Sequence, residues 1–183
     1  MDAFRFSLTP EEKTFLKDLV LYAITSRLRG EKARAPEPPT QTLGARYGAF
    51  VTLKRNGRLR GCIGHIIGDS PLVETIFDMA RAAAFDDPRF PELTASELDG
   101  LEIEISILSP LVPCPDPSEI EVGRHGLLIQ QGLRQGLLLP QVPIEWGWDR
   151  ETFLRQTCHK AGLAPDAWKD PASRIFWFEA EVF

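Results

Sequence analysis

Asn56-Gly57-Arg58-Leu59-Arg60-Gly61-Cys62-Ile63-Gly64 is the stretch that does most to define the fold of this chain of 183 residues. Its first two residues favour a two-residue hairpin turn, because Asn and Gly both tolerate positive φ. Strand-forming residues precede the turn from Tyr47 to Leu53 and follow it from Arg58 to Ile63. The sequence therefore predicts an antiparallel hairpin with Cys62 on its return strand.

The turn length sets an expected register for this hairpin. A regular two-residue turn pairs Arg60 with Leu53 and Cys62 with Val51. Side chains two residues apart on a strand point the same way, so Arg60 and Cys62 should share a face. Glycine within a strand loses side-chain packing and backbone entropy, so the glycines beside Cys62 indicate that something approaches the backbone closely there.

Composition limits the classes of protein that the chain can belong to. With 43% hydrophobic and 26% charged residues, it suits one soluble domain or two small interlocked subdomains. A net charge of −5 argues against broad electrostatic binding of nucleic acid. We expect no membrane segment, because no apolar run reaches about 20 residues, and no signal peptide in Met1–Phe6. Three separated cysteines form no disulfide framework and indicate reduced thiols in the cytoplasm.

The remaining pattern mixes helices with strands. Helices are expected after Thr9 and after Ser70-Pro71, and a third from Asp149 to Gly162. Further strands are expected at 101–108, 127–131, 137–139 and 174–182, and a hairpin followed by a helix occurs twice, at about 47–84 and 127–162. Because hairpins outnumber βαβ crossovers, the predicted fold class is α+β, with mainly antiparallel sheets and packed helices.

Five separated motifs resemble one known family. They are Leu59-Arg60-Gly61-Cys62-Ile63-Gly64, Phe85-Asp86-Asp87-Pro88-Arg89-Phe90, Gly123-Arg124-His125-Gly126-Leu127, Leu138-Leu139-Pro140-Gln141-Val142 and a segment from Trp148-Asp149 to Cys158-His159-Lys160-Ala161-Gly162-Leu163. Their order and spacing are similar to the AMMECR domain, which in prokaryotes is the A protein of the AmmeMemoRadiSam system. The resemblance covers about residues 8–183 and makes 1–183 a single AMMECR-type domain.

The resemblance implies two intimately associated subdomains with a cleft between them. It also implies association with a Memo-like protein and a radical SAM protein, and it supplies no reaction, so whether the chain is an enzyme stays open. The residues expected to bind a substrate or partner are Arg60, Gly61, Cys62, Gly64, Asp86, Asp87, Arg89 and Gln141.

Each candidate residue has a functional and a structural interpretation. Cys62 is the one candidate catalytic residue, a nucleophile or redox thiol if nearby positive charge favours the thiolate, and otherwise a small packing residue. Arginine forks suit a carboxylate or phosphate ligand, but the same arginines and aspartates could form a structural ion-pair network. Gln141 follows a strand that ends abruptly at Pro140, and it either reaches into a cleft or marks a rigid exit from the sheet.

Other site chemistries are disfavoured. Cys62-x-x-His65 and Cys158-His159 do not form a convincing zinc site, because adjacent residues on a helix diverge. No phosphate-loop or cluster-binding motif occurs, so we expect no metal and no cofactor on this chain. The sequence leaves two hypotheses: a cleft-bearing protein that binds a small molecule, peptide or partner, or an enzyme that uses Cys62 to modify a small molecule, peptide or RNA.

Overall fold

The computed structural model describes residues 7–183, and the described chain divides into two units. The larger unit contains residues 7–108 and 181–183, and the smaller unit contains residues 109–180. The expectation about a signal peptide concerns residues 1–6, which lie outside the described residues. In the part that the structure describes, no helix combines the length and apolar character needed to cross a membrane.

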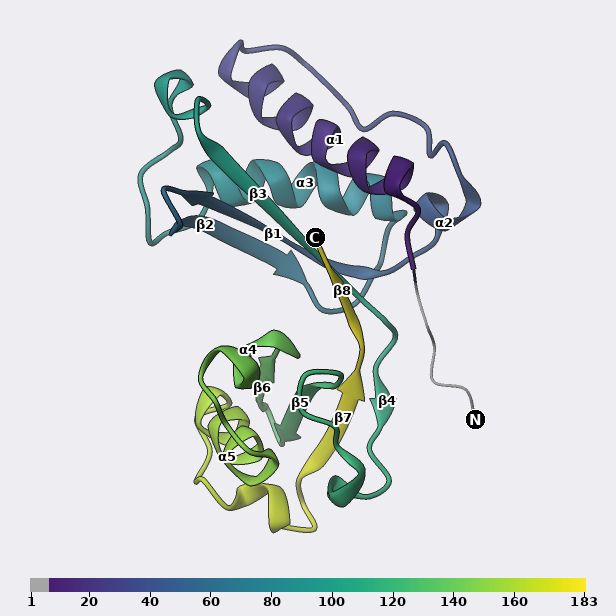
Figure 1. Cartoon of the computed structure of the whole chain (residues 1–183), viewed down its shortest axis with the longest axis vertical. Coiled ribbons are helices and arrows are strands. Elements are labelled where there is room, and N and C mark those ends of the chain that lie inside the picture. Colours follow the sequence, from purple (N-terminus) through teal and green to yellow (C-terminus); the bar gives the residue numbers. More distant parts are fainter. Residues whose placement is uncertain (1–6) are drawn as a thin grey trace. The chain divides into compact units, whose positions relative to one another are not determined.

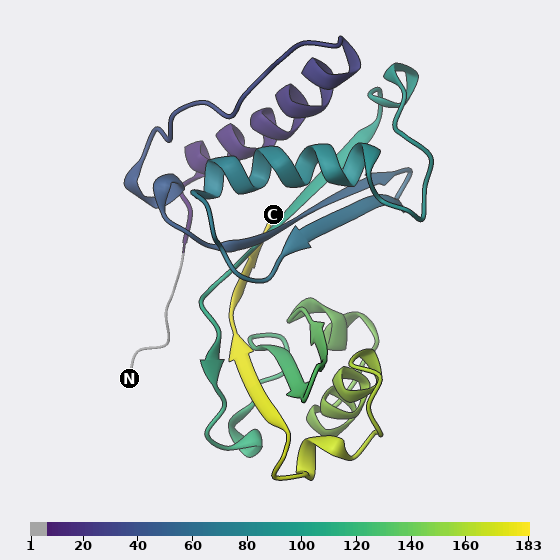
Figure 2. The same ribbon diagram turned by 180° about the vertical axis from the view of Figure 1, so that it is seen from behind.

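The larger unit is a four-stranded antiparallel sheet with helices on one face (Figures 1 and 2). The strand order is β2-β1-β3-β8, and α3 lies along β1 and β2 with α1 packed on α3. Thr9 and Glu12 begin α1 with a capping box, at the helix start that the sequence predicts. The elements are α1 (Pro10–Leu28), α2 (Gln41–Gly44), α3 (Leu72–Phe85), the 3₁₀ turn η1 (Ala95–Glu97), β1 (Gly48–Arg55), β2 (Arg58–His65), β3 (Leu101–Leu108) and β8 (Ala180–Val182).

Alternation along β1 decides which face of the sheet meets the helices. Ala49, Val51 and Leu53 are fully buried in the core that α1 and α3 share. Thr52 lies between two of these residues and therefore points to the opposite face. The helix-covered face is thus apolar, which is what a half-buried antiparallel strand requires.

The hairpin turn forms as predicted, but the register of its return strand does not. Asn56 and Gly57 have φ values of 51° and 69°, which a two-residue turn of this kind requires. The register then shifts by a β-bulge, so that Gly61 faces Leu53 and Arg60 is the extra residue.

The predicted pairs of Arg60 with Leu53 and of Cys62 with Val51 are therefore wrong, since Cys62 faces Thr52. In the predicted register Arg60 would point with Leu53 into the apolar core under the helices. The bulge avoids the cost of burying an arginine in that core, because a slip of one residue moves every later side chain to the other face. Cys62 consequently lies on the face of the sheet away from α3.

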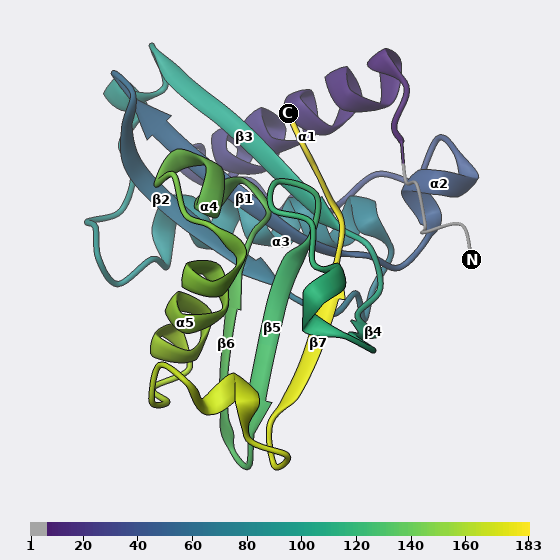
Figure 3. The same cartoon turned by 60° about the horizontal axis from the view of Figure 1, so that its bottom comes forward.

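The smaller unit is also built on a four-stranded sheet, of order β4-β7-β5-β6, with α5 packed on β5 and β6 (Figure 3). Phe153, Leu154 and Cys158 of α5 form its core with Leu127 and Ile129. The elements are β4 (Val112–Pro113), η2 (Pro117–Glu119), β5 (Gly126–Gln131), β6 (Arg134–Leu138), α4 (Gln141–Glu145), α5 (Arg150–Lys160), η3 (Ala167–Lys169) and β7 (Arg174–Phe178).

Three details of the smaller unit differ from expectation. Gly136 lies inside β6, where the absence of a Cβ makes room for the backbone of Ala161. The last expected strand, 174–182, is two strands in different sheets, β7 and β8. The short helix α4 was not expected after Pro140. Hairpin β1–β2 precedes α3 and hairpin β5–β6 precedes α4 and α5, and their kinship as repeated units stays a prediction.

Candidate functional site

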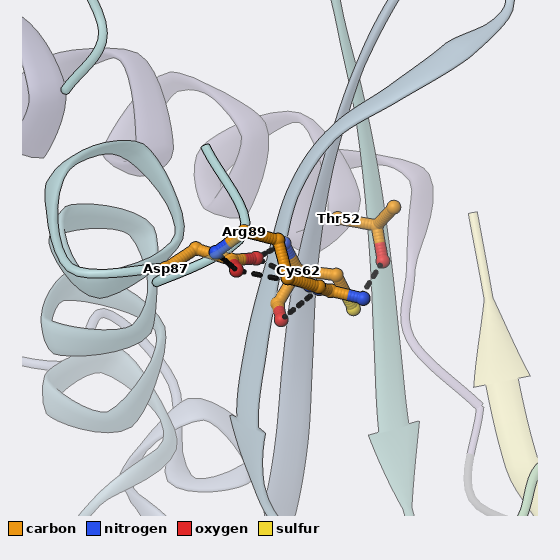
Figure 4. A network of polar contacts seen from close by, with 4 residues as sticks. All are labelled: Thr52, Cys62, Asp87 and Arg89. Atoms are coloured by element: carbon orange, nitrogen blue, oxygen red, sulfur yellow. Dashed lines mark hydrogen bonds and ion pairs between the residues drawn. The ribbon is translucent and has the colours of Figure 1, made fainter. Parts of the chain in front are cut away.

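Cys62 lies on β2, which is an edge strand of the larger sheet, and its outward backbone groups are bonded by two side chains. The Cys62 N–H donates to Oδ2 of Asp87 at 2.9 Å, and Nη2 of Arg89 donates to the Cys62 carbonyl at 3.2 Å (Figure 4). The two side chains occupy the place that a neighbouring strand would take. We call this pair the Asp87–Arg89 clamp.

The clamp is held together by its own ion pair. Arg89 donates from Nε to Oδ1 of Asp87 at 2.9 Å and from Nη2 to Oδ2 at 2.7 Å. The Asp87 side chain is 2% exposed. The hydrogen bond from Arg89 holds the pKa of Asp87 well below its usual range despite the opposing effect of burial, with help from the amides of Cys62 and Arg89. Asp87 is thus a carboxylate at neutral pH, an acceptor that is unsuited to act as a base.

The thiol of Cys62 is half-buried on the face away from the helices. Thr52 donates from Oγ1 to Sγ of Cys62 at 3.2 Å. The Arg89 side chain is 54% exposed, and its Nη1 takes part in none of the hydrogen bonds found within residues 7–183. The site therefore presents a half-buried thiol and a partly exposed guanidinium that is fixed to the backbone of the same residue.

Arg60 forms a separate ion pair. Its Nε and Nη2 donate to Oε1 and Oε2 of Glu97 at 2.6 and 3.1 Å, and its side chain is only 11% exposed. The hydrogen bond from Arg60, together with bonds from Thr94, lowers the pKa of Glu97 to about 2. Nη1 of Arg60 is buried and has no partner among the described residues. Arg60 thus anchors η1 beside β2 and does not offer a free fork to a ligand.

Phe90 connects the two arginines. The guanidinium carbons of Arg60 and Arg89 lie 5.9 and 5.6 Å from the centroid of its ring. Both distances are within the range of cation–π attraction. The aromatic ring therefore helps to fix both side chains.

The signature glycines serve packing within the protein. A Cβ at Gly61 would overlap the carbonyl oxygen of Ala83 in α3, and a Cβ at Gly64 would overlap the ring of Phe50 and the carbonyl of Ala49. The close approach to the backbone that the glycines indicate is therefore made, at least in part, by the protein's own α3 and β1.

The other expected site residues lie elsewhere. Asp86 caps the C-terminus of α3 and faces Arg27 of α1 at 3.5 Å, so it does not join Asp87 at Cys62. Gln141 belongs to the smaller unit, where it is the first residue of α4, and its Oε1 is buried with no partner among the described residues.

Sequence reasoning missed Thr52, Phe90 and Glu97. Glu97 had a detectable signal, since Thr94 and Glu97 have the spacing of a capping box. Phe90 ends a motif that was noticed for its charges. Thr52 had no signal, because its proximity to Cys62 depends on the bulge.

No metal centre is found in residues 7–183, since no three His, Cys, Asp or Glu side chains there are placed to hold an ion. The fold and site define an α+β protein of two antiparallel-sheet units, with a cysteine on a clamped edge strand.

The chain belongs to the AMMECR1 family, whose model matches residues 18–183. It is 47% identical over 189 residues to protein TK0174 of Thermococcus kodakarensis, which covers 97% of this chain and 92% of that protein. It is 43% identical over 183 residues to a protein of Methanothermobacter thermautotrophicus, and the match covers 96% of this chain and 95% of that protein. The crystal structure of the uncharacterized protein PH0010 from Pyrococcus horikoshii matches with a TM-score of 0.89 and 42% identity, over 97% of this chain and 93% of that one. These matches confirm the family resemblance and the α+β class.

Proposed function

We propose that this chain is a binding domain that acts in the cytoplasm with a Memo-like protein and a radical SAM protein, the partners that the family resemblance implies. We place the recognition surface at Arg89 and Cys62. The observation that supports it is the clamp. Arg89 is fixed by Asp87 and by the Cys62 carbonyl, yet more than half of its side chain is exposed.

A guanidinium held in this way is pre-organised for an anion. Its remaining Nη1 group can donate to a carboxylate or phosphate oxygen, and the ordering cost has been met in the free protein. The ligand expected is therefore an acidic group of a partner, a peptide or a small molecule. Arg60 is also paired with a carboxylate, that of Glu97, but its side chain is only 11% exposed, so it supports the surface without binding the ligand.

The proposal is tested by binding of purified Memo-like and radical SAM proteins from the same genome to this chain on a biosensor. Arg89→Gln removes the charge, and we expect it to weaken binding about tenfold, the value of one charge-assisted contact. Arg58→Gln is the matched control, since Arg58 is an exposed arginine in the same hairpin. Equal binding by Arg89→Gln and wild type, with either protein, would overturn the proposal, and so would failure of both proteins to bind wild type.

Thiol chemistry at Cys62 is the second candidate. Its supporting observation is the hydroxyl of Thr52 that donates to the sulfur and the guanidinium of Arg89 that donates to the carbonyl of the same residue, since reactive cysteines occupy electropositive, partly exposed surroundings. Burial raises the pKa of Cys114 to about 11 and also raises that of Cys158. Those two thiols should therefore react slowly at neutral pH.

Iodoacetamide labelling resolved by peptide mass spectrometry tests this candidate. We expect Cys62 to be modified first, with Cys114 and Cys158 modified only slowly. A rate at Cys62 above that of free cysteine at the same pH would favour chemistry, and Cys62→Ser should then abolish any activity found. A Cys62 that is labelled only after unfolding would reject the candidate.

A further inference from the structure

A concave site lies in the smaller unit, and the proposed function makes no use of it. Its volume is about 310 Å³. It is formed by η2, the first turns of α5 and η3. The lining residues are Asp116, Pro117, Ser118, Arg150, Glu151, Leu154 and Trp168.

The interior of this pocket is apolar. Leu154 is a buried member of the unit's core, and Trp168 packs against the same core. The ring of Trp168 already attracts a cation, since Nζ of Lys169 lies 4.9 Å from its centroid. Nε1 of Trp168 is buried and has no hydrogen-bond partner among the described residues. A buried indole N–H normally has an acceptor.

The rim carries both signs of charge. Hydrogen bonds from Ser118 lower the pKa of Asp116, with a smaller contribution from Arg150, so Asp116 is ionised at neutral pH. Arg150 donates from Nη1 to the carbonyl of Ser118, and the residue as a whole is exposed. Glu151 is exposed, with Lys169 at 3.8 Å. An apolar floor is thus ringed by one guanidinium and two carboxylates.

We propose that this pocket binds a free amino acid with an aliphatic or aromatic side chain. The ligand carboxylate would pair with Arg150, its ammonium group with Glu151 and Asp116, and its side chain would lie on Leu154 and Trp168. The volume agrees with this size of ligand, because it is at the lower limit of small-molecule pockets.

The test uses the full chain with ¹⁵N-labelled tryptophan and follows the four indole resonances during titration with L-leucine or L-phenylalanine. Trp168→Phe assigns the Trp168 signal, and Trp146 serves as the internal control. We expect saturable shifts of Trp168 alone, at ligand concentrations up to about 20 mM, which is the range for so small a ligand. Isopentylamine and 4-methylpentanoate, which each lack one charge of leucine, should bind about tenfold more weakly.

Variants locate the two charges. Arg150→Gln and Glu151→Gln should each weaken leucine binding about tenfold, while Arg155→Gln, an exposed arginine on the same helix, should not. The absence of a Trp168 shift, or equal binding of leucine and either singly charged analogue, would overturn the proposal. Neither result would affect the surface at Arg89, because the two tests use different residues and different ligands.

Discussion

Replacement of Asp87 by alanine tests the interpretation of the clamp most directly. The change removes the acceptor of the Cys62 N–H and the partner of Arg89. An orphaned buried amide costs about 1–3 kcal/mol. Breaking a fully buried ion pair costs about 3–5 kcal/mol, but Arg89 is half exposed and water replaces part of its bonding. We therefore expect Asp87→Ala to lower the free energy of unfolding by about 2–3 kcal/mol.

The same argument predicts how the loss depends on pH. The pKa of Asp87 is lowered in the folded state, so its contribution is complete above the unfolded value of about 4 and is lost as pH falls below it. The difference in stability between wild type and Asp87→Asn should thus be constant above about pH 5 and shrink between about pH 4 and pH 2. Glu97 titrates in this range too, but it is present in both proteins and cancels.

Urea unfolding followed by circular dichroism measures both effects. Asp86→Ala is the control, since Asp86 is 56% exposed and its ion pair with Arg27 is long, at 3.5 Å. We expect that control to change stability by less than about 0.5 kcal/mol. A change of the same small size in Asp87→Ala would refute the reasoning. A stability difference between wild type and Asp87→Asn that does not shrink in acid would also refute it.

Two further predictions concern the packing around the bulge. Gly61→Ala should destabilise the protein by about 2–3 kcal/mol, because the new Cβ would overlap the carbonyl of Ala83. Gly44→Ala should be tolerated, because a Cβ there meets only ordinary contacts. Equal thermal denaturation midpoints for the two variants would contradict this prediction. Arg60→Ala and Glu97→Ala should each cost about 2–3 kcal/mol, and the double variant should cost clearly less than their sum, because each single change leaves the other charge buried. A double-mutant cycle by urea unfolding that proved additive would show that the pair is unimportant.

Local signals predicted most of the fold. The turn at Asn56-Gly57, the helix after Thr9, the strand at 101–108 and the helix that follows Asp149 were all expected and all occur. Each depends on residues within a few positions of one another. The bulge at Arg60 was not predicted, because it depends on where α3 packs against β2, and that is a long-range contact.

The site was predicted in part for the same reason. The sequence identified Cys62, Asp87 and Arg89 as candidates. It did not indicate that the two charged residues bond the backbone of Cys62, or that Thr52 bonds its thiol. It also grouped Asp86 with Asp87, although adjacent residues at a helix end point in different directions. A list of polar residues in one motif says nothing about which of them meet.

The bulge connects the structural and the functional interpretations of the signature. Gly61 is needed for α3 to approach, and this approach brings the loop after α3 to the outer edge of β2. Asp87 and Arg89 then close that edge, which would otherwise offer unpaired backbone groups to another strand. The inserted Arg60 turns Cys62 to the face away from the helices. Packing thus accounts for the glycines and for Asp87, whereas it leaves the exposed edge of Arg89 and the half-exposed thiol unexplained, and these are the groups that a ligand would meet.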